Sequence, residues 1–140
     1  KRLKMVTKLF KSKMKNLKWY ATTIEGAEII SQAKLNNSDI KVLFYLLSKI
    51  NEENRVYNIS YWDIASAINL KESSVKKSMM ALRQLSILTK DITAVKTIMI
   101  NPTFFYAGNH TTNTAKYNHF LYCKSLYEEK QKNRKTKIKL

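Results

Sequence analysis

Glycine, proline and cysteine are scarce in this sequence of 140 residues, which contains two Gly, one Pro and one Cys. Too few turn-forming residues are present for the many short strands of a β-sandwich or β-barrel, so we expect a mainly helical fold. Cys123 has no partner for an internal disulfide, which favours a reducing compartment. The sequence also lacks a run of about 18 apolar residues that could span a bilayer. We therefore expect a cytoplasmic protein that is not inserted in a membrane.

Acidic residues are few as well, since ten Asp and Glu stand against 26 Lys and Arg, for a net charge of +16. Lys1 to Lys18 include eight basic residues and no acid, and Lys124 to Leu140 include seven basic residues and two acids. The chain between these ends carries only +3. Codon bias in an AT-rich gene would explain the preference for Lys over Arg, but not the scarcity of Glu. The charge therefore favours a polyanionic partner, because neutralised phosphates release counterions.

The spacing of apolar residues predicts several helices and short extended segments in the first part of the chain. Ser38 is the expected N-cap of the central helix, which should supply much of the core. The predicted helices are residues 3–17, 25–33 and 39–50, with extended segments at 19–24 and 56–59.

The segment from Ser60 to Leu85 has the pattern of a helix-turn-helix. Ser60 and Asp63 are spaced to begin a short helix. Asn69 stands where the tight turn requires left-handed backbone, which Asn tolerates well. The second helix should start between Glu72 and Ser74. Its apolar face is expected to contain Val75, Met79 and Leu82.

Two β-rich runs, residues 86–90 and 96–100, follow this motif and predict a hairpin that ends before Pro102. A helix-turn-helix with a hairpin behind it is typical of a winged helix. The predicted fold is therefore mainly α with a small β-hairpin. The aromatic residues after Pro102 should fold back on the core. A last helix should begin near Ala115 and fray into the basic C-terminal end.

Several short motifs resemble the RepL-type plasmid replication proteins of Gram-positive bacteria. They are Leu46-Leu47-Ser48-Lys49-Ile50, Trp62-Asp63-Ile64-Ala65, the helix with Val75, and Met99-Ile100-Asn101-Pro102 with two bulky apolar residues and Gly108 behind it. The resemblance extends from Leu35 to Gly108. It implies a winged-helix initiator that binds the origin of its own plasmid and has no catalytic site. A transcription regulator of a mobile genetic element remains the alternative.

We expect three regions. Residues 1–20 form a basic amphipathic segment, residues 21–108 the winged helix-turn-helix domain, and residues 109–140 a loop, a helix and a basic tail. The expected partner is double-stranded DNA, bound by a homodimer that associates through the N-terminal helix or the helix at 115–127. Host replication proteins are possible further partners. A basic helix at residues 3–17 could also lie on an anionic membrane, but a DNA-binding core beside it favours phosphate contact.

The residues expected to touch DNA lie on the second helix of the motif and on the wing. Lys77 is the candidate for a base edge and Lys76 for a phosphate, because both lie away from the apolar stripe. The wing lysines should contact the backbone or the minor groove. The full predicted set is Ser73, Ser74, Lys76, Lys77, Met80, Arg83, Lys90 and Lys96.

Catalytic chemistry finds little support in the sequence. His110 and His119 are too far apart for the closely spaced ligands of a nicking enzyme. His119 and Cys123 could offer two zinc ligands at i and i+4, but no second pair completes a tetrahedral site, so they are interpreted as a polar surface pair. A phosphate-binding glycine loop is also lacking. We expect no enzyme activity, cofactor or metal.

The aromatic residues raise the alternative of single-stranded nucleic acid binding, because bases stack on exposed rings. Most of these residues fall on apolar faces and are assigned to the core instead. The residues so assigned are Tyr45, Trp62, Phe104 and Phe105.

Overall fold

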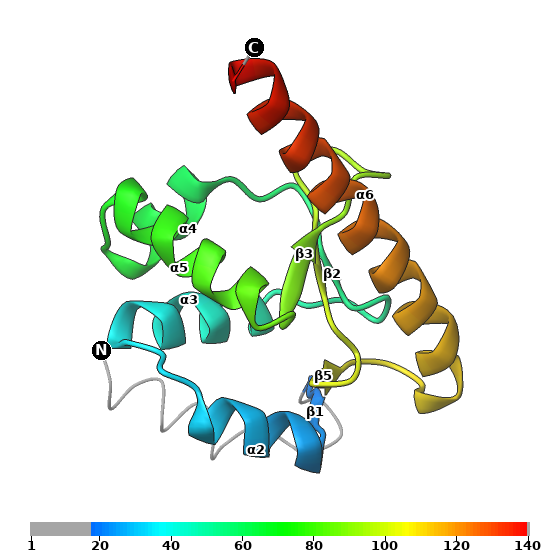
Figure 1. Ribbon diagram of the computed structural model, residues 1–140. Coiled ribbons are helices and arrows are strands. Elements are labelled where there is room, and N and C mark those ends of the chain that lie inside the picture. The colour runs from blue at the N-terminus through cyan, green and yellow to red at the C-terminus, as the bar shows by residue number, and fades with distance from the viewer. Residues whose placement is uncertain (1–17, 140) are drawn as a thin grey trace.

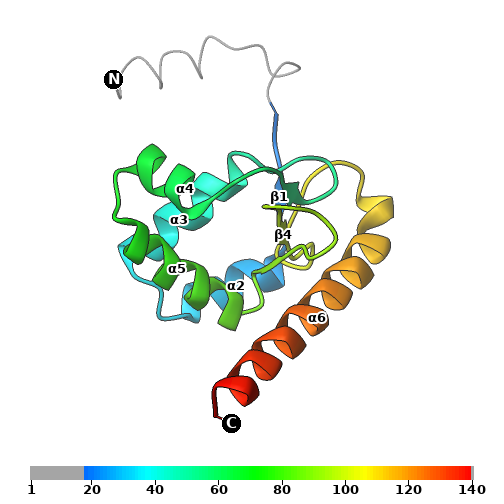
Figure 2. The same cartoon turned by 90° about the horizontal axis from the view of Figure 1, so that it is seen from above.

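A computed structural model describes residues 18–139 of the chain. A group of helices lies on one side of a small sheet, and one long helix lies on the other (Figures 1 and 2). The helices are α2 (Ile24–Gln32), α3 (Asn37–Leu47), α4 (Tyr61–Ile68), α5 (Glu72–Gln84), the 3-10 turn η2 (His110–Thr112) and α6 (Asn113–Lys139). The strands are β1 (Ala21–Thr22), β2 (Arg55–Val56), β3 (Leu88–Lys90), β4 (Ile98–Ile100) and β5 (Phe105–Tyr106).

Helices α3, α4 and α5 pack against one another around an apolar core. The stripe predicted for the second helix of the motif is confirmed, because its three apolar residues are completely or almost completely buried. Helix α4 contributes mainly Ile64 and Ala65. The buried apolar residues of α3 and α5 are Val42, Leu43, Leu46, Leu47, Val75, Met79 and Leu82.

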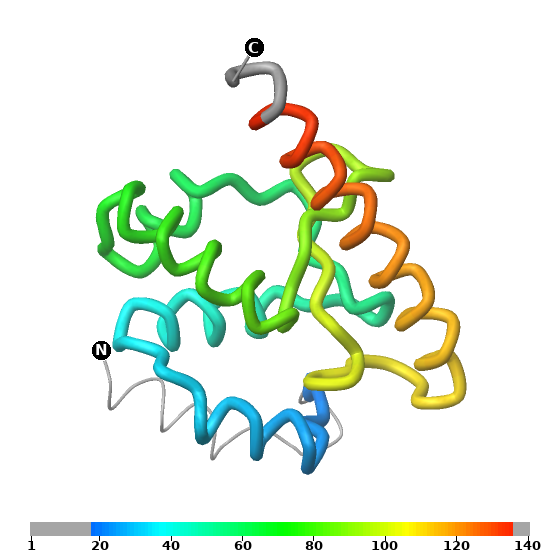
Figure 3. The backbone as a smooth tube through the Cα atoms, viewed as in Figure 1, coloured from blue at the N-terminus to red at the C-terminus, as the bar shows by residue number. Residues whose placement is uncertain are grey.

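The extended segment predicted near Trp19 is confirmed as the short strand β1. It pairs with β5, so the beginning of the described chain lies beside residues about 85 positions later (Figure 3). Helix α2 follows directly and crosses this pair closely at Gly26. A Cβ on Gly26 would lie 2.7 Å from the Cα of Phe104, so this contact requires glycine.

Helix α3 is capped by Asn36, and the prediction of Ser38 as its cap was wrong. The Asn36 side chain accepts a hydrogen bond from the Asp39 N–H at 2.8 Å, and the Asp39 carboxylate accepts one from the Asn36 N–H at 3.1 Å. This reciprocal arrangement needs an acceptor three residues after the cap. Ser38 is followed at that distance by Lys41, which has no acceptor. The helix ends at Leu47, three residues before its predicted end.

The cap at the start of α4 and the turn between α4 and α5 both have the predicted form. The Ser60 hydroxyl accepts a hydrogen bond from the Asp63 N–H at 3.1 Å, and Asp63 accepts one from the Ser60 N–H at 2.9 Å. The hydrogen bonds from the Ser60 backbone and side chain lower the pKa of Asp63. Asn69 ends α4 in the left-handed region, at φ 55° and ψ 51°. The N–H of Leu70 then donates to the carbonyl of Ala65 at 3.0 Å and closes the turn.

The hairpin predicted after α5 is confirmed: β3 and β4 are antiparallel, with Thr89 opposite Met99. A helix-turn-helix followed by this hairpin makes the fold a winged helix. Strand β2 pairs with the other side of β4 and completes a sheet of order β2-β4-β3. The bounds predicted for β2 were wrong, because the strand ends at Val56. Asn58 has a positive φ of 52°, which turns the chain away from the sheet.

Asn54 joins three segments that lie far apart in the sequence. This fully buried residue precedes β2 in a left-handed conformation, at φ 63°. Its Nδ2 donates to the carbonyls of Ile100 at 3.1 Å and Phe105 at 2.7 Å. Its Oδ1 accepts a hydrogen bond from the Ala107 N–H at 2.9 Å. One amide therefore satisfies backbone groups at the end of β4, in β5 and just after β5.

Helix α6 begins at Asn113 and continues to Lys139, so the prediction that it frays into a basic tail was wrong. It packs along β3 with Phe120 and Cys123 completely buried. Leu121 and Tyr122 lie on its exposed side. None of the helices between residues 18 and 139 is both long and apolar enough to cross a membrane. The predicted amphipathic helix at 3–17 lies outside the described residues.

The left-handed turn at Asn69 gives a test of the fold. Asn69→Ala should lower the free energy of unfolding by about 1 kcal/mol, because an alanine Cβ is strained at positive φ. Asn69→Gly is the matched control and should change the stability much less, since glycine adopts this conformation freely. Urea denaturation of the three proteins measures both effects. Equal losses for the two variants would contradict the conformational explanation.

Candidate nucleic-acid interface

The face of α5 opposite its apolar stripe is open to solvent. Ser73, Lys76 and Lys77 are exposed, and 48% of Met80 is accessible. Helices α3 and α4 pack against the back of α5, so the exposed face is presented by a rigid element. The structure thus brings together on one surface four of the residues that the sequence singled out.

Ser74 and Arg83 have different surroundings from the other selected residues of α5, since both are only partly exposed. Arg83 Nη1 donates a hydrogen bond to the Tyr61 hydroxyl at 3.2 Å, and its guanidinium lies 5.3 Å from the centre of the Tyr127 ring. Arg83 therefore connects α5 to α4 and α6. The sequence could not indicate this role, because Tyr61 and Tyr127 are distant in the chain.

The wing loop, defined here as residues 91–97, joins β3 to β4. Lys90 and Lys96 are both exposed, one at each end of this loop. Lys96 has a positive φ of 49°, and its carbonyl accepts a hydrogen bond from the Ile59 N–H at 2.9 Å. The loop is therefore held against the segment that leads into α4. Both lysine side chains remain available at its edges.

A groove of about 770 Å³ lies between the wing loop and the C-terminal half of α6. Lys90 and Lys96 line it from the wing, and Lys130 and Arg134 line it from α6. Its other lining residues in the described part of the chain are neutral. Four cations around an uncharged floor create a positive field that attracts an anion. We call this feature the basic groove.

Lys130 and Arg134 lie beside the wing and were not among the predicted site residues, because the C-terminal end was interpreted only as a source of charge. Their spacing of four residues, with Tyr127 three residues before Lys130, places them on one helical face and was a usable signal. The position of that face beside the wing depends on tertiary packing, which the spacing does not reveal.

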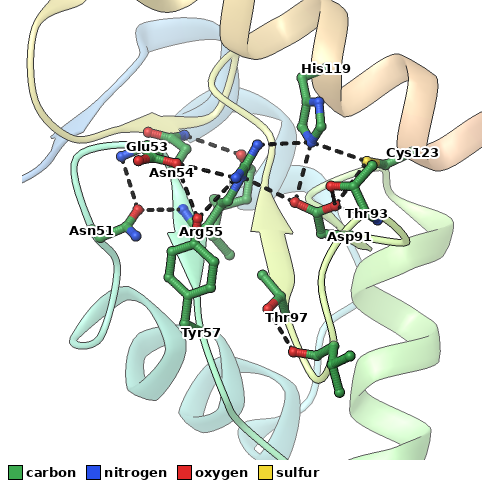
Figure 4. A network of polar contacts seen from close by, with 12 residues as sticks. Asn51, Glu53, Asn54, Arg55, Tyr57, Asp91, Thr93, Thr97, His119 and Cys123 are labelled. Atoms are coloured by element: carbon green, nitrogen blue, oxygen red, sulfur yellow. Dashed lines mark hydrogen bonds and ion pairs between the residues drawn. The ribbon is translucent and has the colours of Figure 1, made fainter.

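The base of the wing is tied to α6 by a polar cluster of Arg55, Asp91, His119 and Cys123 (Figure 4). Asp91 is fully buried, and one of its carboxylate oxygens, Oδ2, lies 3.1 Å from Arg55 Nε and 3.2 Å from His119 Nε2. The other, Oδ1, accepts hydrogen bonds from the Thr93 N–H at 2.9 Å and from the Cys123 thiol at 3.4 Å. The interpretation of His119 and Cys123 as a surface pair was wrong, because Cys123 is completely buried against the wing.

The protonation of this cluster follows from its surroundings. Burial is the largest influence on the pKa of Asp91 and favours its neutral form, but hydrogen bonds from Thr93, His119 and Cys123 outweigh it and lower that pKa. Burial also raises the pKa of Cys123 to about 11, with the Asp91 charge acting in the same direction. For Arg55, burial acts against the charge, but the Tyr57 hydrogen bond and nearby carboxylates leave its pKa raised. The cluster therefore holds a carboxylate, a guanidinium and a neutral thiol.

Trp62 is 64% exposed, so its assignment to the core was wrong. It lies two residues before Ile64, which is about 200° around a helix and on the opposite side. Tyr45 is partly buried, whereas Phe104 and Phe105 are buried as predicted. Trp62 and Tyr45 line a shallow surface pocket with Tyr57 and Lys49.

A family model described as Firmicute plasmid replication protein (RepL) matches residues 11–139. The chain belongs to the RepL family. The resemblance inferred from short motifs is thereby confirmed, and it extends beyond the Leu35 to Gly108 segment in both directions. The α5 face, the wing and the basic groove all lie within the matched residues.

Two solved structures of a Staphylococcus aureus protein align with the RepL-family chain. "S. aureus MepR G34K Mutant" aligns with a TM-score of 0.35 and 14% identity, over 97% of this chain and 81% of that one. "S. aureus MepR bound to ethidium bromide" aligns with a TM-score of 0.36 and 14% identity, over 99% of this chain and 88% of that one. Both TM-scores are below 0.5. No curated protein sequence matches the chain.

The contrast between Arg83 and Lys76 gives a test of this surface. Arg83→Ala should lower the free energy of unfolding by about 1 kcal/mol, because it removes a hydrogen bond and a cation-π contact. Lys76→Ala is the control on the same helix and should leave stability nearly unchanged, since the side chain is exposed. Thermal and urea unfolding measure the difference. Equal stability of the two variants would show that Arg83 does not connect the helices.

Proposed function

We propose that this RepL-family protein binds double-stranded DNA at the origin of the plasmid that encodes it and initiates replication there. The exposed face of α5 carries the proposal. In helix-turn-helix proteins, a helix in this position enters the major groove and contacts bases with its first turns. Ser73 and Lys77 lie one helical turn apart on this face, and Met80 follows within the next turn. Family membership supports the role in replication.

Lys77 is the proposed base contact. It lies away from the buried Val75 and Met79, and an ammonium group can donate to the guanine O6 and N7 atoms in the major groove. Lys76 lies beside this face and is the proposed phosphate contact. Ser74 and Arg83 stay in the proposed contact set. Arg83 has five N–H donors, so its hydrogen bond to Tyr61 leaves others for a phosphate.

The basic groove is the proposed binding site for the DNA backbone beside the major groove. Lys90 and Lys96 from the wing act together there with Lys130 and Arg134 from α6. Phosphate contacts fix the position of a protein on the duplex without reading its sequence. The groove should therefore raise affinity for all duplexes, whereas the α5 face should discriminate among them.

The three regions 1–20, 21–108 and 109–140 are proposed to have different roles in DNA binding. The winged helix reads the DNA, and the basic ends add affinity that does not depend on sequence. A homodimer on a repeated site is proposed as well, with the exposed Leu121 and Tyr122 of α6 available for contact between copies. Recruitment of host replication proteins would follow from the assembled complex.

Lys77→Ala should weaken binding to the preferred duplex by about 1 to 3 kcal/mol and relax the preference at one base pair. The preferred duplex is first obtained by selection from random sequences, and affinities are then measured on it and on a scrambled duplex. Lys34→Ala is the matched control, an exposed lysine in the loop before α3. The mass of each complex in the same titrations gives the number of chains bound.

Two results would contradict the assignment of Lys77. One is an unchanged preference in Lys77→Ala, which would place base recognition elsewhere. The other is an equal loss in Lys34→Ala, which would reduce the effect to net charge. A transcription regulator would bind through the same face, so fold and DNA binding do not separate the two functions. The two functions are separated by testing whether a plasmid that carries the gene's neighbouring DNA is maintained. If the protein initiates replication, maintenance of this plasmid should fail with Lys77→Ala.

The basic groove is tested by the salt dependence of binding. Removing two phosphate contacts with Lys130→Ala and Arg134→Ala should flatten the slope of log affinity against log salt by about 2, at roughly 0.9 per contact. The loss of affinity should be similar on the preferred and the scrambled duplex. Lys34→Ala with Lys41→Ala removes the same charge from exposed positions that do not line the groove. An equal effect in this control would mean that only net charge matters.

A further inference from the structure

The polar cluster contains three side chains that commonly bind metals, close enough to share one ion. The carboxylate of Asp91, the imidazole of His119 and the thiol of Cys123 have ligand atoms within 4.8 Å of one another. Asp91 lies at the start of the wing loop, and the other two lie one turn apart on α6. We propose that these three residues bind a divalent transition-metal ion, of which Zn²⁺ fits the ligand set best.

The distances match those around a tetrahedral zinc ion. Ligands at 2.0 to 2.3 Å from Zn²⁺ are about 3.3 to 3.7 Å from one another in that geometry. His119 Nε2 lies 3.2 Å from Asp91 Oδ2 and 3.4 Å from Cys123 Sγ. Cys123 Sγ lies 3.4 Å from Asp91 Oδ1. The two Asp91 contacts use different carboxylate oxygens, so one ion would be held by both oxygens or by one of them after the carboxylate rotates, and the three ligand atoms lie within 4.8 Å of one another before any such movement.

The contacts of His119 Nε2 are not all compatible as hydrogen bonds. This single nitrogen faces a donor, Arg55 Nη2, at 3.0 Å and an acceptor, the Asp91 carboxylate, at 3.2 Å. With a proton it can donate to Asp91, and without one it can accept from Arg55, but it cannot do both. A cation between His119, Asp91 and Cys123 uses a lone pair from each, and it resolves the conflict when Arg55 Nη2 moves away from His119.

Arg55 occupies the same region and competes with a metal for Asp91. Its Nε is 3.1 Å from Asp91 Oδ2, but the geometry of a hydrogen bond is not met and this nitrogen has no such partner. The guanidinium also contacts Glu53 at 3.2 Å and the Tyr57 hydroxyl at 2.9 Å, both on the exposed side. It can keep these two partners when a metal takes Asp91.

Ions can reach the site from solvent. A pocket of about 470 Å³ has His119 in its wall, and the charges of Glu52 and Glu53 there are balanced by Arg55 and Lys116, so its charged side chains sum to zero. The fourth position of the metal would be open to water from this pocket, as in three-ligand zinc sites. Binding balances charge, since the Cys123 thiol releases its proton to solvent and thiolate and carboxylate together offset the ion.

The metal would tie the wing to α6 at one end of the basic groove. That consequence for DNA rests on the proposed function, whereas the metal site itself does not. The two are separable, because metal binding can be measured without DNA. A bound ion with no effect on DNA affinity would leave the site intact and remove only its proposed effect on the wing.

Co²⁺ is the probe, added to the reduced full-length protein while absorption spectra are recorded. We expect one Co²⁺ per chain, visible bands of tetrahedral coordination, a near-ultraviolet band from thiolate to Co²⁺, and displacement by Zn²⁺. Cys123→Ser should abolish the thiolate band. His119→Gln should weaken Co²⁺ binding by about 10-fold or more. Loss of a residue that only hydrogen-bonds to a metal ligand already has an effect of about this size, and His119 is a ligand itself. Circular dichroism without metal verifies that both variants are folded.

Arg55→Gln tests the competition. This variant should bind Co²⁺ more tightly than the unaltered protein, because it lacks the neighbouring cation. Lys124→Gln is the control, since it removes a cation of the same helix that pairs with Glu128 outside the cluster. Absence of the thiolate band in the unaltered protein would overturn the proposal, and so would spectra that Cys123→Ser leaves unchanged. The cluster would then be a metal-free connection between the wing and α6.

Discussion

Burial of Val75, Met79 and Leu82 against α3 and α4 fixes the rotation of α5 about its own axis. Once this stripe is inward, the positions on the other side of the helix are exposed without any further interaction. The left-handed backbone at Asn69 sets the direction in which α5 leaves α4. The proposed base-reading face is thus a by-product of core packing, and its side chains need no partners within the protein.

Local features of the chain could be predicted from the sequence because each depends on residues a few positions apart. The cap formed by Ser60 and Asp63 and the turn at Asn69 are of this kind. So are the apolar stripe of α5 and the hairpin after it. Ser38 was chosen wrongly as a cap because the decisive feature was the partner three residues on, which Asn36 has and Ser38 lacks.

Features that depend on distant segments could not be predicted in the same way. Strand β2 joins the hairpin only in three dimensions, and Arg83 is held by Tyr61 and Tyr127 from two other helices. Asp91 gave no signal in the sequence, because a lone carboxylate before a polar loop is ordinary. The basic groove and the polar cluster both arise where α6 crosses the wing. The sequence indicated the charge and ligand types of α6, but not the surface that it covers.

The three hydrogen bonds of the Asn54 side chain have a consequence for how the chain folds. They join positions 46 to 53 residues apart, so they form only after a long loop has closed, with its loss of chain entropy. The contacts of α4 with α3 and with α5 join nearer parts of the chain and close shorter loops, and those between α3 and α5 close loops of intermediate length. The helical half should therefore assemble early, and the half that contains β4 and β5 should follow once Asn54 is enclosed. In this order, α5 acquires its position before the wing is in place beside it.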